Sequence, residues 1–342
     1  MTGAVLATAG TLLLLATIAD TITTVLRIET HSGPITHVVS QTLWRLLAGP
    51  WARREGGPPA VTGVAITLVV VAVWLLLTFA GWYLIFSASA QAVLHGDSGD
   101  PADSWARAYF VAYVISTLGI GDYVPGGALW QVLTGLAATA GFAMATLVIT
   151  YMVSITAAVS SKRRFARTIS QLGGSPEQIV RRAWDGEGFD SLEDHLIPLV
   201  AQLNEMAEQH LTYPIIYYYR TKERHVAHWP AVATLDDALL IVDELVDERV
   251  RPPTLAVTPA RAAVTAYVVT LPEFKLGGPV PEPPPPALHE LRDVGIPLRA
   301  GAAIDAAVRA NADRRRRLAA VLDHQGWTWK EAVQPQTGAV PS

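Results

Sequence analysis

The sequence predicts an all-α membrane protein, and two observations carry that prediction. Of the 342 residues, 51% are hydrophobic and 16% are charged, whereas a soluble domain carries about a quarter charged residues. Three apolar segments lie near residues 3–26, 61–87 and 127–159. Each is long enough to cross a bilayer core, which needs about 20 helical residues.

Composition excludes several classes of function. The net charge is −4, so no basic excess points to nucleic acid, and no motif for binding it is present. Cysteine is absent, which excludes disulfides and cysteine-ligated metals. The acidic residues and histidines show no familiar ligand spacing, and we expect neither an enzyme nor a resident cofactor.

The first element, residues 1–26, is expected to be a retained transmembrane helix. A secretory signal is the alternative, but no Lys or Arg precedes Arg27 and no convincing cleavage site follows the apolar run. Asp20 lies near the inner end of this helix. Since a lipid-facing carboxylate is costly, we expect its side chain to turn toward protein or to reach the interface.

The second element is a linker, residues 27–60, and its charge predicts the topology. Basic residues near membrane ends mark the cytoplasmic side. They occur in this linker and after the third apolar segment, at Arg27, Arg45, Arg53, Arg54, Lys162, Arg163, Arg164 and Arg167. Acidic residues dominate the loop near 97–103. We therefore expect a multi-pass protein of the cell membrane with its N-terminus outside and its C-terminal half in the cytoplasm.

Within the linker, Ile35 to Leu47 carries apolar residues at near-helical spacing. This pattern fits an interfacial helix along the inner leaflet. A loop helix packed on the cytoplasmic domain fits equally well.

The third element, residues 61–160, is expected to enclose a re-entrant loop. Ser104 to Ser116 reads as a short helix with Asp103 or Ser104 as its N-cap, and it is too short to span the core. Non-helical backbone at membrane depth is tolerated where it is buried or lines a watery cavity. The glycine-containing stretch that follows should therefore line a pore.

That stretch, residues 117–122, has the composition of an ion-coordinating backbone. Rings of carbonyls can replace the hydration shell of K⁺ without fixed charge. Gly119 and Gly121 reach backbone angles that ordinary residues reach poorly, and Thr117 can add its hydroxyl. Leu118 and Ile120 would point away from the axis into the surrounding packing. A glycine-rich turn between two helices is the alternative reading.

The segment 61–159 resembles the pore-loop K⁺ channel superfamily, whose filter is typically Thr-Val-Gly-Tyr-Gly-Asp between an outer and an inner helix. The resemblance implies K⁺ sites at the carbonyls of Thr117, Leu118, Gly119 and Ile120, a filter that includes Gly121, and Asp122 at the outer mouth. It also implies a homotetramer, because one chain carries one pore loop. Ile120 replaces the usual aromatic and cannot make its hydrogen bond, which bears on filter rigidity.

Gly141 matches the position of a gating hinge in that family. Close helix packing explains the same glycine equally well, because Gly135 and several alanines share this helix. No span carries Lys or Arg at every third residue, so a voltage sensor of that kind is not expected.

The C-terminal half is expected to comprise a helical domain at 161–278, a proline-rich linker at 279–286 and a helical segment at 287–342. Ser175 should cap a helix to Trp184, Ser191 should begin one reaching Leu211, and a third should run from Thr234 to Val250.

Three clusters of residues in this half fit an ordinary structural role better than a binding site. The acids of the third helix, Asp236 and Asp237 among them, fit a solvated face better than a Ca²⁺ site. Arg314 to Arg317 fit a solvated face better than a lipid contact. The Tyr213 to Arg220 run fits a core or subunit interface better than a ligand site. No Gly-x-Gly-x-x-Gly motif follows a strand.

The sequence thus predicts a tetrameric channel that conducts K⁺ passively, contacts membrane lipid and is gated by an unknown signal through its cytoplasmic domain. A non-conducting membrane-anchored scaffold or signalling protein is the main alternative. A subunit of an active uptake system fits less well, since such transporters usually place four pore loops in one chain.

Overall fold

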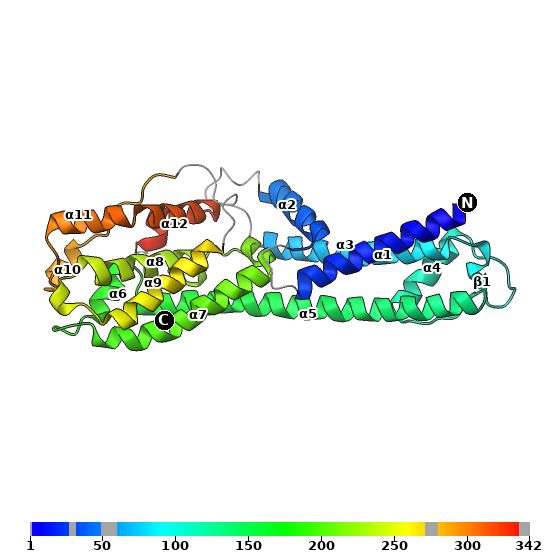
Figure 1. Ribbon diagram of the computed structural model, residues 1–342, viewed down its shortest axis with the longest axis horizontal. Coiled ribbons are helices and arrows are strands. Elements are labelled where there is room, and N and C mark those ends of the chain that lie inside the picture. The colour runs from blue at the N-terminus through cyan, green and yellow to red at the C-terminus, as the bar shows by residue number, and fades with distance from the viewer. Residues whose placement is uncertain (1, 27–31, 49–59, 271–279, 335–342) are drawn as a thin grey trace. The chain divides into compact units, whose positions relative to one another are not determined.

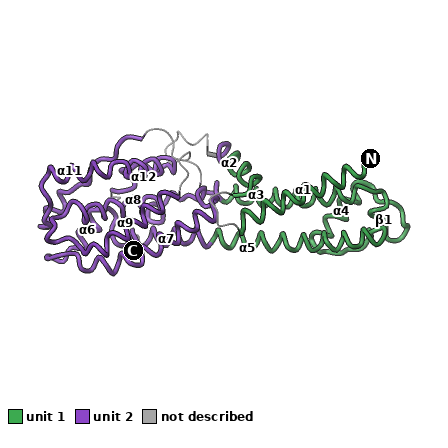
Figure 2. The backbone as a smooth tube through the Cα atoms, in the orientation of Figure 1, with its two compact units in different colours: residues 1–43, 64–156 green, residues 44–63, 157–342 purple. Residues whose placement is uncertain are grey.

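The computed structural model describes residues 2–26, 32–48, 60–270 and 280–334 (Figure 1). It confirms the all-α membrane fold, with helices as the dominant element. The chain divides into two compact units (Figure 2). Unit 1 comprises residues 1–43 and 64–156, and unit 2 comprises residues 44–63 and 157–342. Arg27, Arg53 and Arg54, which contributed to the predicted topology, lie outside the described residues.

Three helices are long and apolar enough to cross a membrane, as predicted. They are α1 (Thr2–Leu26), α3 (Thr62–Phe86) and α5 (Ala128–Leu172). α5 has 45 residues, about twice the length that a bilayer requires. Its apolar first part belongs to unit 1, and the helix continues without interruption to Leu172.

The remaining elements of unit 1 are the linker helix, the re-entrant helix and the short elements on either side of that helix. They are α2 (Pro34–Ala48, to residue 43 in this unit), the turn η2 (Ala90–Ala92), β1 (Val93–His95), α4 (Ser104–Ile115) and β2 (Tyr123–Pro125). The two strands pair antiparallel, with Leu94 opposite Val124. The pairing ties the loop that follows α3 to the segment that precedes α5.

A helix does form in the linker, where α2 covers the stretch predicted to be helical. Its first turn packs on the carboxylate of Asp20, which is 1% exposed. Asp20 accepts from the backbone N–H of Ile35 at 2.7 Å and from the Thr36 hydroxyl at 2.6 Å. The side chain therefore turns toward protein and acts as a cap for α2. Whether α2 lies along a membrane surface stays a prediction.

Unit 2 is built from helices around one buried helix, α8. Its elements are α6 (Pro176–Ala183), α7 (Asp190–Thr212), η3 (Pro214–Tyr218), η4 (Arg224–Val226), α8 (His228–Leu240), the π-helical turn η5 (Ile241–Leu245), η6 (Glu248–Val250), α9 (Thr254–Val269), α10 (His289–Asp293), α11 (Gly301–Ala310), α12 (Ala312–His324) and α13 (Trp329–Val333). Ser175 caps α6 as predicted, accepting from Gln178 at 3.2 Å.

Several predicted boundaries in this unit are wrong. α7 begins at Asp190 with no side-chain cap, so Ser191 lies inside the helix. The helix expected from Thr234 to Val250 instead begins at His228 and changes to the π-helical turn at Ile241. The segment predicted to be helical at 287–342 holds four helices in its described part, α10 to α13.

The predicted solvated face is wrong at Asp236 and Asp237, because every residue of α8 is buried. Asp237 is paired with Arg315 through two hydrogen bonds of 2.9 and 3.0 Å, and Asp236 is paired with Arg314. Arg315 is 1% exposed and also donates to the carbonyl of Pro284 at 2.7 Å. Two of the four consecutive arginines therefore serve to neutralise acids inside unit 2 rather than to cover its surface.

Candidate functional site

The re-entrant helix α4 begins and ends where its local sequence dictates. The Asp103 carboxylate accepts from the backbone N–H of Ala106 at 2.8 Å, which satisfies one of the open donors of the first turn. The buried face of α4 packs in a cluster with α3. This face is formed by Phe110, Val111, Tyr113 and Val114. Within this cluster the rings of Phe86 and Phe110 meet edge to face at 5.1 Å. The end of α4 is thereby held against the outer helix.

In the segment after α4, the backbone angle φ alternates between positive and negative values from residue to residue. Thr117, Gly119 and Gly121 have positive φ values of 60°, 61° and 93°. Leu118 and Ile120 do not, since among described non-glycine residues Thr117 is the one in the left-handed region. In an ordinary extended chain successive carbonyls point to opposite sides. Alternation between left- and right-handed conformations instead allows successive carbonyls to turn toward one side.

Thr117 is the costly member of this alternation. A β-branched residue at positive φ is a genuine outlier, because its side chain crowds the backbone. Its backbone N–H donates to the carbonyl of Val114 at 3.0 Å, and that of Leu118 donates to Tyr113 at 2.9 Å. These bonds close the C-terminus of α4 and hold the strained residue. The partial negative charge of that helix end favours a cation nearby.

Three hydrogen bonds hold the C-terminal end of the segment 117–122. The Tyr109 hydroxyl donates to the carboxylate of Asp122 at 3.3 Å, and the Tyr113 hydroxyl donates to the carbonyl of Tyr123. The backbone N–H of Gly96 donates to the carbonyl of Asp122 at 2.8 Å. Both tyrosines come from α4, so the helix that precedes the segment also fixes its far end.

The sequence indicated that Ile120 lacks a hydroxyl to hold the segment, but it did not predict the hydrogen bonds from the Tyr109 and Tyr113 hydroxyls. The signal was present, since Tyr109 and Tyr113 are four residues apart and therefore on one face of α4. Their acceptors could not be read from the sequence. The acceptor of Tyr113 is a backbone carbonyl, which every residue type carries, so the sequence does not identify it.

The side chains of the segment are exposed in a single chain. Leu118 is 68% exposed and Ile120 is 46% exposed. The expectation that they pack around a filter stays a prediction, because one chain does not cover them. The described residues hold no group of three or more His, Asp or Glu side chains that could bind a metal ion.

Gly141 lies where α5 passes the end of α4. A Cβ at this position would clash with the backbone carbonyl of Ile115, whereas a Cβ at Gly135 would meet no atom within 4 Å. Close packing therefore suffices to explain a glycine at 141. Its role as a gating hinge stays a prediction.

In unit 2, α5 is held by a buried lysine. Lys162 is 2% exposed, and its ammonium donates to the carbonyl of Ile216 in η3 at 2.8 Å. One residue earlier, the Ser161 hydroxyl donates to Glu205 of α7 at 3.2 Å. The helix that passes through unit 1 as an apolar span is thus fixed to the core of unit 2 by polar contacts.

Comparison with known proteins identifies the family to which this chain is related. A family model described as "Ion channel" matches residues 66–158, which run from α3 through α4 into α5. The chain is 31% identical over 325 residues to an uncharacterized membrane protein, YdjJ, of Bacillus subtilis (strain 168), with 94% of each chain covered. That similarity extends through unit 2. No solved structure matches this chain.

Proposed function

Since this chain belongs to the two-transmembrane pore-loop family of ion channels, we propose that it forms a homotetramer that conducts K⁺ passively through residues 117–121. In this proposal the backbone carbonyls of Thr117, Leu118, Gly119 and Ile120 hold the ion. The Thr117 hydroxyl adds a further oxygen, and Asp122 stands at the outer mouth.

The alternating sign of φ at Thr117, Gly119 and Gly121 is the observation that best supports this proposal. A channel must replace the water around K⁺ with oxygens, and carbonyls do so without a fixed charge that would trap the ion. Backbone that turns successive carbonyls to one side meets this need. An ordinary turn between two helices needs no such repetition.

We propose a tetramer because one chain cannot surround an ion with carbonyls by itself. One chain supplies one row of carbonyls, and an ion in a ring needs several rows around it. The exposed side chains of Leu118 and Ile120 also need cover that one chain does not provide. Three further copies supply both the remaining rows and the cover.

The cytoplasmic helical domain is the proposed site of gating. α5 is one helix from Ala128 to Leu172, so a shift of its second part is transmitted to the part within the channel. Lys162 and Ser161 attach that second part to η3 and α7. With the topology proposed from charge, the N-terminus is outside and unit 2 faces the cytoplasm.

Rubidium flux into proteoliposomes that hold the purified protein tests conduction. Flux driven by a K⁺ gradient without ATP, and reduced when Na⁺ replaces K⁺ inside, is the expected result. No flux under any condition favours a non-conducting membrane-anchored scaffold. The mass in mild detergent should correspond to four chains, and a dimer as the largest species would contradict the pore.

A further inference from the structure

His95 lies at the end of β1, next to the C-terminal end of the segment 117–122. It is the one histidine between the start of α3 and the end of α5. In the strand pair His95 is opposite Tyr123, and the two rings meet edge to face at 5.4 Å. The next N–H along the chain, that of Gly96, donates to the carbonyl of Asp122 at 2.8 Å. A change at His95 therefore acts directly on the residues that end the segment.

The imidazole of His95 holds a tight turn by accepting hydrogen bonds. Its Nδ1 atom accepts from the backbone N–H of Asp97 at 3.3 Å and from that of Ser98 at 3.4 Å. The backbone closes the same turn, because the His95 N–H donates to the carbonyl of Asp100 and the Gly99 N–H donates to that of His95, both at 2.9 Å. An imidazole nitrogen accepts a hydrogen bond only while it carries no proton. The turn therefore requires a neutral His95 with its proton on Nε2.

The turn after His95 also leads to the start of α4. Beyond the turn, the N–H of Ala102 donates to the carbonyl of Val93 at 3.0 Å, so the chain pairs back on β1. The next residue, Asp103, begins α4 as its N-cap. β1 thus lies between the strand that ends the pore loop and the residues that begin it, and the turn can act on both.

Histidine is an unusual residue for this task. A side chain that accepts from the backbone two residues on is ordinarily Asn, Asp or Ser, none of which changes charge near neutral pH. Histidine is the side chain whose charge ordinarily changes between pH 5 and 8. The turn at His95 therefore gains a dependence on pH that the usual acceptors would not give it.

Carboxylates lie close to this turn. The titratable groups of the elements that contact His95 are Asp97 and Asp100 of its own turn, Tyr123 of β2 and Asp122 just before that strand. A protonated imidazole has two donors and no acceptor. It would release the N–H groups of the turn and donate to carboxylates instead. The turn therefore has two arrangements that differ by one proton.

We propose that His95 is a positioning residue for conduction and that its protonation reduces the current. While neutral, it holds the turn, and the turn holds Asp122 through the N–H of Gly96. When charged, it gives up the turn and adds a positive charge beside the proposed outer mouth, which repels an entering cation. Both effects lower conduction. This inference rests on the proposed channel function.

Recordings of single channels in planar bilayers, with acid applied to one side at a time, test the effect on conduction. In the proposed topology the loop of His95 faces outside and unit 2 faces the cytoplasm, so acid should act from one side alone. Lowering the pH on that side from about 8 to about 5, the range over which histidine changes charge, should reduce the mean current. We expect a factor of about five, which corresponds to one lost hydrogen bond.

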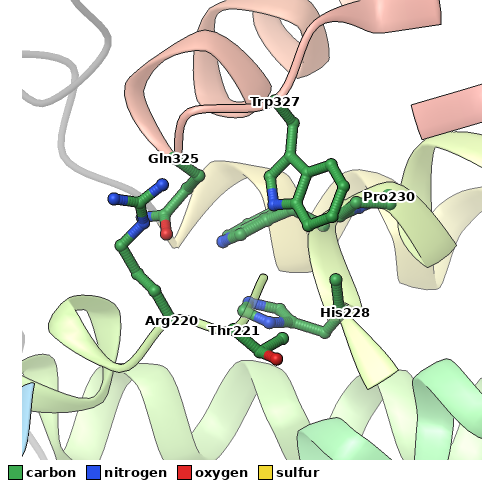
Figure 3. Close-up of a pocket in the computed structure, with 8 residues that line it drawn as sticks. Arg220, Thr221, His228, Pro230, Gln325 and Trp327 are labelled. Carbon is green, nitrogen blue, oxygen red and sulfur yellow. The ribbon is translucent and has the colours of Figure 1, made fainter. Parts of the chain in front are cut away.

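His95→Gln separates protonation from other effects of acid. Glutamine keeps an acceptor oxygen but takes up no proton, so the mean current of this variant should be the same at both pH values. His228→Gln is the matched control and should keep the native response. His228 belongs to unit 2, where it is 7% exposed and lines a small cavity with Trp327 (Figure 3). Equal acid responses in the native protein and in His95→Gln would overturn the inference.

The protonation state of His95 can be measured in the native protein without reference to conduction. In nitrogen NMR of the full-length protein with labelled histidines, the signal that disappears in His95→Gln should, near pH 8, be that of a neutral ring with its proton on Nε2. A proton on Nδ1 would contradict the two hydrogen bonds and overturn the inference. If the protein conducts and acid on neither side changes its current, the inference is wrong and the channel function stands. Absence of all current contradicts the channel function and the positioning role with it, and the NMR signal still decides whether His95 holds the turn.

Discussion

The indole Nε1 of Trp74 in α3 donates a 2.9 Å hydrogen bond to the carboxylate of Asp20 in α1. The same carboxylate receives the backbone N–H of Ile35 and the hydroxyl of Thr36 at the start of α2. One acidic side chain thus joins two membrane-spanning helices to a third helix. A charge that is costly in lipid is tolerated here because donors from protein surround it.

Asp20→Asn should destabilise the protein by about 1–2 kcal/mol, because the amide keeps the shape but loses the charge that strengthens these bonds. The apparent melting temperature of the protein in detergent should fall. Asp97→Asn, in the exposed loop between α3 and α4, is the control and should leave it unchanged. An unaltered melting temperature in Asp20→Asn would mean that the carboxylate is not what holds α2.

Gly119→Ala should abolish rubidium flux while leaving the oligomer assembled. Gly119 has a φ of 61°, which an alanine reaches at a cost, although no atom lies within 4 Å to block its Cβ. The expected loss therefore comes from the backbone angle alone. Gly135→Ala, in helical backbone with equally open space, is the matched control and should conduct. Normal flux in Gly119→Ala would place the ion path elsewhere.

Ile120→Tyr should raise the K⁺/Na⁺ permeability ratio or the open probability. A tyrosine adds a hydroxyl that can anchor the segment, and one such bond of about 1 kcal/mol shifts an equilibrium roughly fivefold. Recordings in planar bilayers under bi-ionic conditions measure both quantities. If the native protein is already strongly selective and neither quantity changes, stiffness at position 120 is not what matters.

Tyr113→Phe tests the same idea in the opposite direction. It removes the bond from the Tyr113 hydroxyl to the carbonyl of Tyr123 and keeps the packing of the ring against Phe110. The open probability or the selectivity should fall. A result identical to the native protein would mean that this anchor does not hold the exit of the segment.

His228 should make the protein less stable as pH falls below about 6.5. Burial, and after it the charge of Lys162, lowers the pKa of His228 in the folded state. The unfolded chain takes up the proton near the ordinary pKa of about 6.5, so it binds more protons than the folded chain at acid pH. The free energy of unfolding should then fall by up to about 1.4 kcal/mol per pH unit.

His228→Gln should flatten this slope, and thermal unfolding between pH 7 and pH 5 measures it. His289→Gln, on the exposed surface of α10, is the control and should keep the native slope. Equal slopes in the native protein and in His228→Gln would show that another group accounts for the acid sensitivity.

The C-terminal half shows where sequence patterns fail. Asp236, Asp237, Arg314 and Arg315 have the composition of solvated faces, and all four are largely buried. Charges are rare in cores, so the pattern favours solvent unless the partner is known. The partners here are separated by 78 residues, and neither local sequence specifies the other.

The sequence by itself determined the membrane fold, the three spans, the short helix that precedes residues 117–122 and the family they resemble. These features follow from hydrophobic length and from the backbone freedom of glycine, which are properties of a single segment. Only the tertiary structure decided that Asp20 caps α2, that Tyr109 and Tyr113 hold the end of the segment, and that Asp237 is paired with Arg315. Each of these is a contact between two different segments of the chain, and the energy of such a contact depends on geometry that no one segment contains.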